Sequence, residues 1–300
     1  MDKDIELLME RGTMNMIKVI TNKGIISNDL FHNVSWVSKL EECLIPIQEI
    51  LTIKRGERSG WNALFYPPEN SGIESEYIKP ALRNPALLKS YTVQSDSAVF
   101  CCHKSKDELR QSGHTGALNW IEKYENIRNG RGKLLPEVLS HRGGFWYELD
   151  DTAKADFVTA LNPDKRLFVS MPEENTFVNQ QFIQIIVKDV NVSKDLVHAL
   201  LNSLSGMFVI EAARETDGVG VSSTKLRNMY MINPQVILDS DALEIVELFD
   251  KIKNRNVMDI EDELKDSDRE IFDRKVLQAV GHEEIYDALK ESLLLYTRYD

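Results

Sequence analysis

The sequence changes character at Asn233 and Pro234, and this change constrains the fold more than any other feature. Before it, short runs of aromatic and β-branched residues alternate with helical patterns and with turns that contain Gly or Pro, a mixture typical of a sheet with interspersed helices. After it, residues 239–297 contain three helical patterns joined by weak linkers. The sequence therefore predicts an α+β fold, in which a mixed-sheet domain with interspersed helices is followed by an acidic α-helical tail.

Three segments follow from these patterns. Residues 1–42 open with a helical pattern at residues 3–22, residues 43–235 form the mixed-sheet domain, and residues 236–300 form the tail. The boundary near residue 43 lies where the apolar run CLIPIQEILTI begins, which leads into the basic turn KRGERSGWN and is punctuated by Pro46 and Gly56. A chain of 300 residues is long enough for one large core or two modest ones.

Local patterns predict individual elements. Aromatic, apolar and β-branched residues predict strands at residues 89–93, 97–102, 145–147, 165–171 and 182–188. Helices are expected at residues 116–126 and after Ser193, with Leu196, Leu200, Leu204 and Met207 in one apolar stripe. The spacings of Ser105 with Glu108 and of Ser267 with Glu270 match capping boxes, and Gly281 matches a helix end. Residues 128–144 contain four glycines and are expected to form a loop.

The charge is unevenly distributed along the chain. The net charge is −12, and residues 231–300 carry 9 basic and 18 acidic side chains. Residues 51–150 carry 14 basic and 12 acidic side chains, with basic residues in local clusters. Duplex binding depends largely on Lys and Arg at the phosphates, so the total charge argues against a DNA partner. Because most of the excess acid lies in the tail, the middle segment remains compatible with DNA.

Several features bear on the compartment. No run of 18 or more apolar residues occurs, so we expect no membrane-spanning helix and no membrane partner. The first residues, MDKDIELLMERG, are acidic and unlike a signal peptide. Cys101 and Cys102 are adjacent, so their side chains would point to opposite faces of a strand, which favours a core position over a disulfide. These features predict a cytoplasmic protein.

Signatures of independent catalysis are absent from the sequence. It has neither a G-x-x-x-x-G-K-[ST] phosphate loop nor a G-x-G-x-x-G turn after a strand. Cys101, Cys102 and His103 lack the spacing of a zinc site, so no metal ligands and no catalytic residues are predicted. Pro163-Asp164 and Glu263-x-Lys265 match the acidic-plus-lysine pattern of metal-dependent nucleases, but they lie about a hundred residues apart.

Two basic clusters are candidates for contact with DNA. The first contains Lys54, Arg55, Arg58 and Trp61. Its glycines let the backbone approach a phosphate closely, and its indole offers stacking. The second contains Arg128, Arg131 and Lys133. This composition is typical of a flexible loop that contacts phosphates. The respective alternatives are a solvated turn and a plain surface loop.

Two further clusters offer groups that recognise bases or phosphates. One contains His141 and Arg142, and the other contains Arg214, Ser222, Ser223 and Lys225. The first pair could reach base edges, because Arg pairs well with O6 and N7 of guanine in the major groove. The second cluster could hold a phosphate through backbone N–H groups, and a structural corner after a helix is the alternative. The nearby Phe145 and Tyr147 are expected in the core.

The order of motifs resembles the C-terminal target-recognition region of adenine-N6 DNA methyltransferases, including single-chain restriction-methylation enzymes. The pieces that carry this resemblance are IQEILTIKRGERSGWNALFY, IESEYIKPALRNPALLKSYTV, HKSKDEL, ALNWIEKYE, GGFWYEL, KDLVHALLNSLSGMFVIEAARETDGVGVSSTKLRNMYMINP and DREIFDRKVLQAVG. The resemblance covers residues 43–300, and residues 1–42 look like the helical connector out of a methyltransferase core.

The resemblance implies double-stranded DNA as a partner and sequence-specific recognition for a restriction-modification or phage-defence system. It also implies a catalytic domain, in cis or in trans, that flips an adenine and transfers a methyl group from S-adenosylmethionine. Such a domain carries Asn-Pro-Pro-Tyr or Asp-Pro-Pro-Tyr. This sequence has only Phe65-Tyr66-Pro67-Pro68, in which the aromatic residues precede the two prolines. We therefore expect this chain to bind no cofactor itself and not to be catalytic alone.

Two alternatives remain open at the level of sequence. One is a protein-interaction subunit of a defence complex, which docks a basic partner through the acidic helical tail. The other is an endonuclease with a cryptic metal site.

Overall fold

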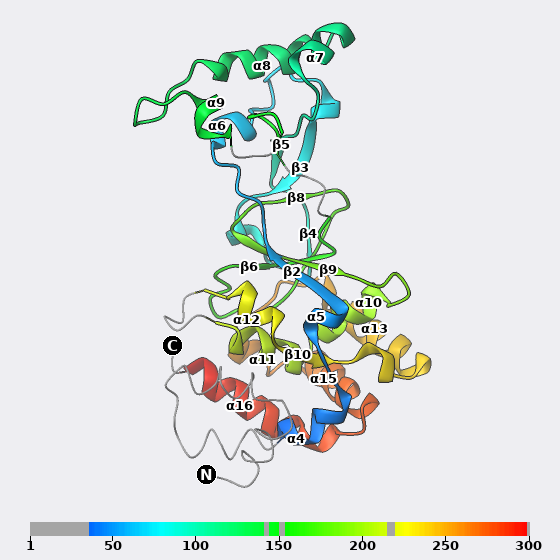
Figure 1. Cartoon of the computed structure of the whole chain (residues 1–300). Coiled ribbons are helices and arrows are strands. Elements are labelled where there is room, and N and C mark those ends of the chain that lie inside the picture. Colours follow the sequence, from blue (N-terminus) through cyan, green and yellow to red (C-terminus); the bar gives the residue numbers. More distant parts are fainter. Residues whose placement is uncertain (1–35, 141–143, 150–153, 215–219, 299–300) are drawn as a thin grey trace.

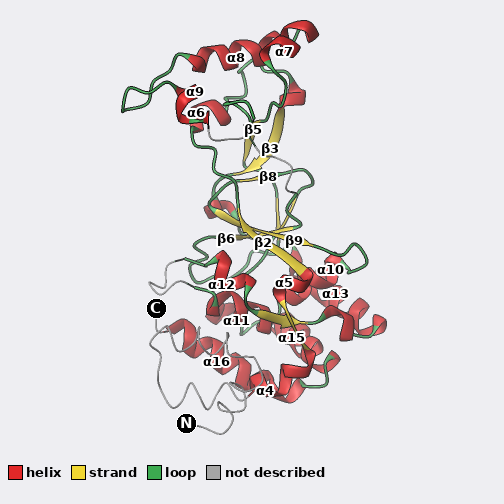
Figure 2. Cartoon of the chain, viewed as in Figure 1, coloured by secondary structure: helices red, strands yellow, loops and turns green. Residues whose placement is uncertain are grey.

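The computed structural model describes residues 36–140, 144–149, 154–214 and 220–298. Figure 1 shows an elongated arrangement, with a lobe of short helices and strands at one end and a larger helical body at the other. We call residues 57–82, 96–140 and 144–149 the small lobe, and residues 83–95 and 170–180 the waist. The remaining described residues form the body. Figure 2 shows most of the long helices in the body and the strands concentrated between the two ends.

A three-stranded antiparallel sheet closes the body toward the waist. Its strands are β2 (Leu51–Arg55), β9 (Phe182–Val187) and β6 (Phe157–Ala160), in the order β2-β9-β6. One face carries Ile53, Ile185 and Phe157, which align across the three strands. These side chains are almost fully buried, so this face packs into the apolar core of the body.

The body is completed by helices and a second, two-stranded sheet. Its long helices are α10 (Lys194–Leu201), α11 (Leu204–Ala212), α13 (Asp239–Lys253), α15 (Ser267–Ala279) and α16 (Tyr286–Arg298). Its shorter helices are α4 (Trp36–Leu40), η1 (Glu41–Cys43), α5 (Ile47–Ile50), α12 (Ser223–Arg227), η5 (Pro234–Val236), α14 (Ile260–Glu263) and η6 (Glu283–Ile285). The antiparallel pair is β1 (Leu44–Pro46) with β10 (Tyr230–Ile232). The sequence of α11, LSGMFVIEA, is apolar on nearly all sides, which explains why this helix lies inside the body.

The helices of the acidic tail share the core of the body. Ile245, Phe249, Phe272 and Leu289 are fully buried in the same apolar cluster as Phe157 of the sheet. The helix pair α13 and α15 is also joined by Lys275, whose Nζ lies 2.8 Å from Asp241 Oδ1. These helices therefore contribute to the body's stability, while the predicted segment boundaries at residues 42 and 235 stay predictions.

The small lobe has a separate apolar core. It contains α6 (Asn62–Phe65), η2 (Ser75–Tyr77), β3 (Ile78–Leu82), β5 (Ser97–Phe100), α7 (Lys106–Ser112), α8 (Thr115–Glu125) and α9 (Leu135–Val138). Strand β3 pairs antiparallel with β5 and parallel with β8 (Phe177–Val178) of the waist. Trp120 Nε1 and Tyr124 Oη of α8 donate hydrogen bonds to the carbonyls of Leu64 and Ala63, at 2.9 and 2.6 Å. These bonds fix α6 against α8.

The waist joins the two parts through several chain crossings. It contains η3 (Pro85–Leu87) and the parallel pair of β4 (Thr92–Val93) with β7 (Met171–Pro172). At the exit of β2, the backbone nitrogens of Gly56 and Glu57 donate to the carbonyls of Phe182 and Val178. A Cβ atom on Gly56 would lie 2.1 Å from the carbonyl oxygen of Asn179, so only glycine allows this close approach.

The structure confirms the predicted fold class and several local elements. Residues 97–102 and 182–188 contain β5 and β9, and residues 116–126 coincide with α8. Ser105 and Glu108 form both hydrogen bonds of a capping box at α7. Ser193 caps α10, and Gly281 has a φ of 80° just after α15. Cys101 and Cys102 are buried in the small lobe. These features depend on local spacing, which the sequence displays directly.

Other local predictions were wrong. Residues 145–147 form a turn in which Glu148 N donates to Phe145 O. Tyr147 is buried as expected, but Phe145, also expected in the core, is exposed because the turn directs it away from the core. Only the end of residues 165–171 is a strand. The single helix predicted after Ser193 is divided into α10 and α11, because Ser203 starts a new helix by accepting from Gly206 N. Asp266, and not Ser267, caps α15. The predicted loop at residues 128–144 contains α9.

Candidate nucleic-acid interface

The first predicted cluster lies where the chain leaves the body for the small lobe. Lys54 Nζ lies 3.4 Å from Glu57 Oε1, so this charge is partly compensated. Arg55 is exposed and its Nε donates to the carbonyl of Gln180 at 2.8 Å. Arg58 is also exposed, whereas Trp61 is half-buried against the small-lobe core. The structure therefore brings two arginines to the surface beside the waist and assigns the indole mainly to packing.

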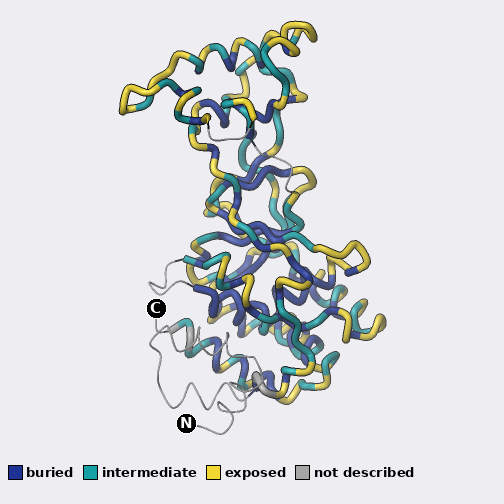
Figure 3. The backbone as a smooth tube through the Cα atoms, in the orientation of Figure 1, coloured by how far each residue is buried: buried dark blue, intermediate teal, exposed yellow. Residues whose placement is uncertain are grey.

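The second predicted cluster lies in a hairpin between α8 and α9. This hairpin projects from the small lobe, at the upper left of Figure 1, and Figure 3 shows its exposed tip. Arg128, Arg131 and Lys133 are all exposed. The backbone nitrogen of Asn129 donates to the carbonyl of Lys133 at 2.8 Å, and the nitrogen of Gly132 donates back to the carbonyl of Asn129 at 2.9 Å. The loop is therefore an ordered turn, not an unstructured connection.

Arg214 and its predicted partners lie at a corner between α11 and α12. Arg214 is 4% exposed, and its Nε lies 2.6 Å from Glu211 Oε2, a carboxylate that is itself fully buried. Lys225 Nζ donates to the carbonyl of Arg214 at 2.6 Å, which links the end of α11 to α12. Ser222 caps α12 and Ser223 is its first residue. These contacts give Arg214 a role inside the body, and a phosphate role for Ser222, Ser223 and Lys225 stays a prediction.

The third predicted pair, His141 and Arg142, lies outside the described residues. On its C-terminal side, Phe145 is 37% exposed and stacks on Tyr147, with the ring centroids 5.3 Å apart. Tyr147 Oη donates to the carbonyl of Lys104 at 3.0 Å. The chain that follows this pair is therefore anchored on the small lobe, the same part of the molecule that carries the hairpin.

A polar cluster that the sequence did not predict lies at the start of α8. Tyr77 Oη and His114 Nδ1 are 2.5 Å apart, and Glu76 Oε1 lies 3.3 Å from His114 Nδ1 and 3.0 Å from Lys104 Nζ. Hydrogen bonds from Tyr77 and Lys104 lower the pKa of Glu76. Because the four residues are separated by up to 38 positions, no local pattern could reveal them. The cluster holds η2 against α8.

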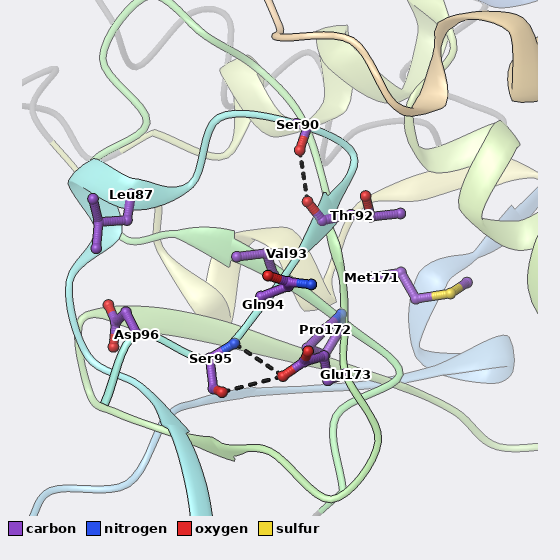
Figure 4. A pocket seen from close by; sticks show the side chains of 10 residues that line it. All are labelled: Leu87, Ser90, Thr92, Val93, Gln94, Ser95, Asp96, Met171, Pro172 and Glu173. Carbon is purple, nitrogen blue, oxygen red and sulfur yellow. Dashed lines mark hydrogen bonds between the residues drawn. The ribbon is translucent and has the colours of Figure 1, made fainter. Parts of the chain in front are cut away.

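An open hollow of about 670 Å³ lies at the waist, beside the paired strands β4 and β7 (Figure 4). Its lining residues are Leu87, Ser90, Thr92, Val93, Gln94, Ser95, Asp96, Met171, Pro172 and Glu173. Within it, Glu173 Oε2 accepts hydrogen bonds from the backbone nitrogen and the hydroxyl of Ser95, both at 3.1 Å. The lining contains two carboxylates and no cation, so it is poorly suited to holding a phosphate.

Glu263, one of the acidic residues that matched a nuclease pattern, has structural partners. Glu263 is 1% exposed, and its Oε1 accepts from Tyr91 Oη at 2.9 Å and from Arg255 Nη2 at 2.7 Å. Lys265 pairs with Asp262 instead, at 2.8 Å. Among the described residues, no group of three or more His, Cys, Asp or Glu side chains is arranged to hold a metal ion.

Glu263 belongs to a buried network around Arg269. Arg269 is fully buried, and its Nε lies 2.8 Å from Asp273 Oδ2 while its Nη1 lies 3.7 Å from Glu263 Oε1. Burial opposes the charge on Arg269, but the carboxylates of Asp273 and Glu263 raise its pKa above the ordinary value. Arg269 also contacts the hydroxyl of Tyr91, at 3.2 Å. The network therefore ties the tail helices to the waist.

Comparisons with known proteins identify a structural neighbour but no sequence family. No family model matches the sequence, and no curated protein matches it. The fold is similar to that of the type IIG restriction endonuclease BpuSI, with a TM-score of 0.61 and 13% sequence identity. The match covers 91% of this chain and 33% of BpuSI, so the chain spans about a third of that protein's length. Of the helices in the described part of the chain, none has the length and apolar character needed to cross a membrane.

Proposed function

We propose that this chain recognises the DNA target of an adenine-N6 DNA methyltransferase in a restriction-modification or phage-defence system. The observation that carries this proposal is the structural match, in which nearly the whole chain aligns with one third of a type IIG restriction enzyme. The motif order of residues 43–300, which resembles a target-recognition region, supports the same function independently.

The charge distribution of the structure also supports a DNA partner. The exposed Arg55 and Arg58 lie beside the waist, and the exposed Arg131 and Lys133 lie in the projecting hairpin. Phosphate contacts fix a protein on the duplex and base contacts then specify the sequence. In this proposal the small lobe and the adjoining waist face the DNA, and the acidic body faces away from it.

The proposal divides the work between this chain and a catalytic domain. That domain, in cis or in trans, binds S-adenosylmethionine and receives the flipped adenine. This chain recognises the target sequence and positions the DNA for the catalytic domain. The exposed cations named above are the residues expected to contact DNA, together with Arg142.

Fluorescence anisotropy with a randomised duplex at low salt tests the proposal. We expect the full chain to bind, and the triple variant with Arg55, Arg131 and Arg142 changed to Ala to bind at least about tenfold more weakly. The matched control changes Lys39, Lys251 and Lys265 to Ala. These lysines are exposed on the body, so their replacement removes the same total charge as the triple variant. Absence of binding by the unmodified chain, or an equal loss in the control, would count against the proposal.

A further inference from the structure

The hairpin between α8 and α9 is held in shape by its own side chains. Asn129 Oδ1 accepts hydrogen bonds from the backbone nitrogens of Arg131 at 2.9 Å and Lys133 at 3.0 Å. Arg128 Nη1 donates to the carbonyl of Gly132 at 2.7 Å. Gly132 has a φ of +77°, a conformation that favours glycine. Asn129 and Arg128 are therefore used by the loop itself.

The other two cations of the hairpin have no such internal role. Arg131 and Lys133 are exposed, and neither side chain has a hydrogen bond or ion pair with any described residue. The nearest preceding carboxylate, Glu125, is occupied by Lys106, with Oε2 and Nζ 2.8 Å apart. Glu137, on α9, is the acidic residue that follows the hairpin. The tip therefore carries a net positive charge that the small lobe does not neutralise internally.

The backbone of the tip is accessible to a large partner. A Cβ atom added at Gly130 or Gly132 would meet nothing within 4 Å, so both glycines border open space. A loop that is ordered before binding loses less conformational freedom when a ligand arrives. An ordered loop with outward cations and an open backbone suits a densely charged anionic polymer.

We propose that residues 127–135 form a pre-shaped phosphate-binding finger, in which Asn129 and Arg128 hold the loop while Arg131 and Lys133 bind phosphates of double-stranded DNA. This inference rests on the proposed function and adds a division of roles within it. The three cations that the sequence grouped together have different tasks, because the contact of Arg128 with Gly132 directs its guanidinium back into the loop.

The salt dependence of binding separates the two roles. The logarithm of the association constant falls with the logarithm of salt concentration by about 0.9 for each phosphate neutralised. Changing both Arg131 and Lys133 to Ala is expected to reduce the magnitude of this slope by about 1.8. Asn129→Ala keeps both charges, so we expect an unchanged slope with a roughly two- to tenfold weaker affinity at every salt concentration, from the lost ordering of the loop.

The experiment uses the full chain, a fixed duplex and anisotropy at several salt concentrations. The control pair Lys39→Ala with Lys265→Ala, on the body, is expected to leave the slope unchanged. A double finger variant whose slope equals that of the unmodified chain would overturn the finger and leave the proposed function standing. A reduced slope in Asn129→Ala would overturn the assignment of Asn129 as the residue that holds the loop in shape. Failure of the unmodified chain to bind any duplex would overturn the proposed function itself.

Discussion

The body and the small lobe differ in where they keep their charges. Among the described residues of the body, the buried acidic, basic and histidine side chains are His198, Glu211, Arg214, Glu263, Arg269 and Asp273. In the small lobe, every described charged side chain is at least partly exposed, and the apolar core is supplemented by bonds from Trp120, Tyr124 and Tyr147 to carbonyls. Buried charges must be paired, so those of the body specify its internal geometry. Those of the small lobe lie at the surface, where some form ion pairs, such as Lys106 with Glu125, and Arg131 and Lys133 of the hairpin face solvent.

Removing a buried cation should cause the largest change. Arg269→Met leaves the fully buried Asp273 without its guanidinium partner and leaves Glu263 with Arg255 alone, so we expect the free energy of unfolding to fall by about 3–5 kcal/mol. Chemical denaturation followed by circular dichroism measures this. Arg274→Met, on the same helix but with a partly exposed side chain, is the control and should cost less than about 1 kcal/mol. Equal losses of unfolding free energy in the two variants would contradict the difference proposed between buried and exposed charges.

Changing the junction between the two parts should cause the next largest effect. In Gly56→Ala, the added Cβ would lie 2.1 Å from the backbone oxygen of Asn179, which cannot move without disturbing the waist. We expect a loss of about 1–3 kcal/mol in unfolding free energy. Gly130→Ala, where the added atom meets nothing within 4 Å, is the control and should be nearly neutral. Near-neutral behaviour of both variants would mean that the junction tolerates rearrangement.

Acid should destabilise the body through His198. Burial lowers the pKa of His198 to about 3, and its Nδ1 has no hydrogen-bond partner among the described residues. Above pH 6.5 the imidazole is neutral in the folded and in the unfolded protein. Below pH 6.5 the unfolded protein binds a proton at this ring, whereas the folded protein does not bind it until about pH 3. Stability is therefore lost as the pH falls from 6.5, by about 2 kcal/mol at pH 5.

The matched variant for this titration is His198→Gln, which keeps a donor for the carbonyl of Val169 but does not titrate. Between pH 7.5 and pH 5, the free energy of unfolding should fall by about 2 kcal/mol more in the unmodified protein than in this variant. The same acid sensitivity in both proteins would show that His198 is not its source.

The smallest effect on stability is expected in the hairpin. Arg131→Ala and Lys133→Ala remove exposed side chains that make no hydrogen bond or ion pair with a described residue, so the free energy of unfolding should change by less than about 0.5 kcal/mol. Thermal unfolding of each single variant checks this. A loss above about 1 kcal/mol would mean that these cations support the fold, which would weaken their assignment to a partner.

The sequence predicted those features that depend on neighbouring residues. The helix at residues 116–126 and the capping box of Ser105 follow from spacings within a few positions. The exposed cations of the hairpin could likewise be found from local composition, because a Gly-rich basic loop has few ways to bury its charges. The fold class followed from the change of pattern at Asn233.

Features that depend on distant pairing could not be predicted. Arg55 of β2 pairs with Ile183 of β9, and the whole small lobe lies between these two strands in the sequence. The partners of Arg269 include Tyr91 and Asn202, which no local pattern connects. Local composition groups Arg214 with exposed residues, because its burial depends on the packing of α11, which its neighbours in sequence do not reveal.

Selection from a pool of randomised duplexes tests the proposed function most directly. The full chain would be incubated with the pool at low salt, and the bound duplexes would be sequenced over successive rounds. We expect enrichment of one short motif that contains an adenine, because a target-recognition region reads a defined sequence for an adenine-N6 methyltransferase. A bound pool with the same sequence composition as the input, recovered with folded protein, would contradict the proposal.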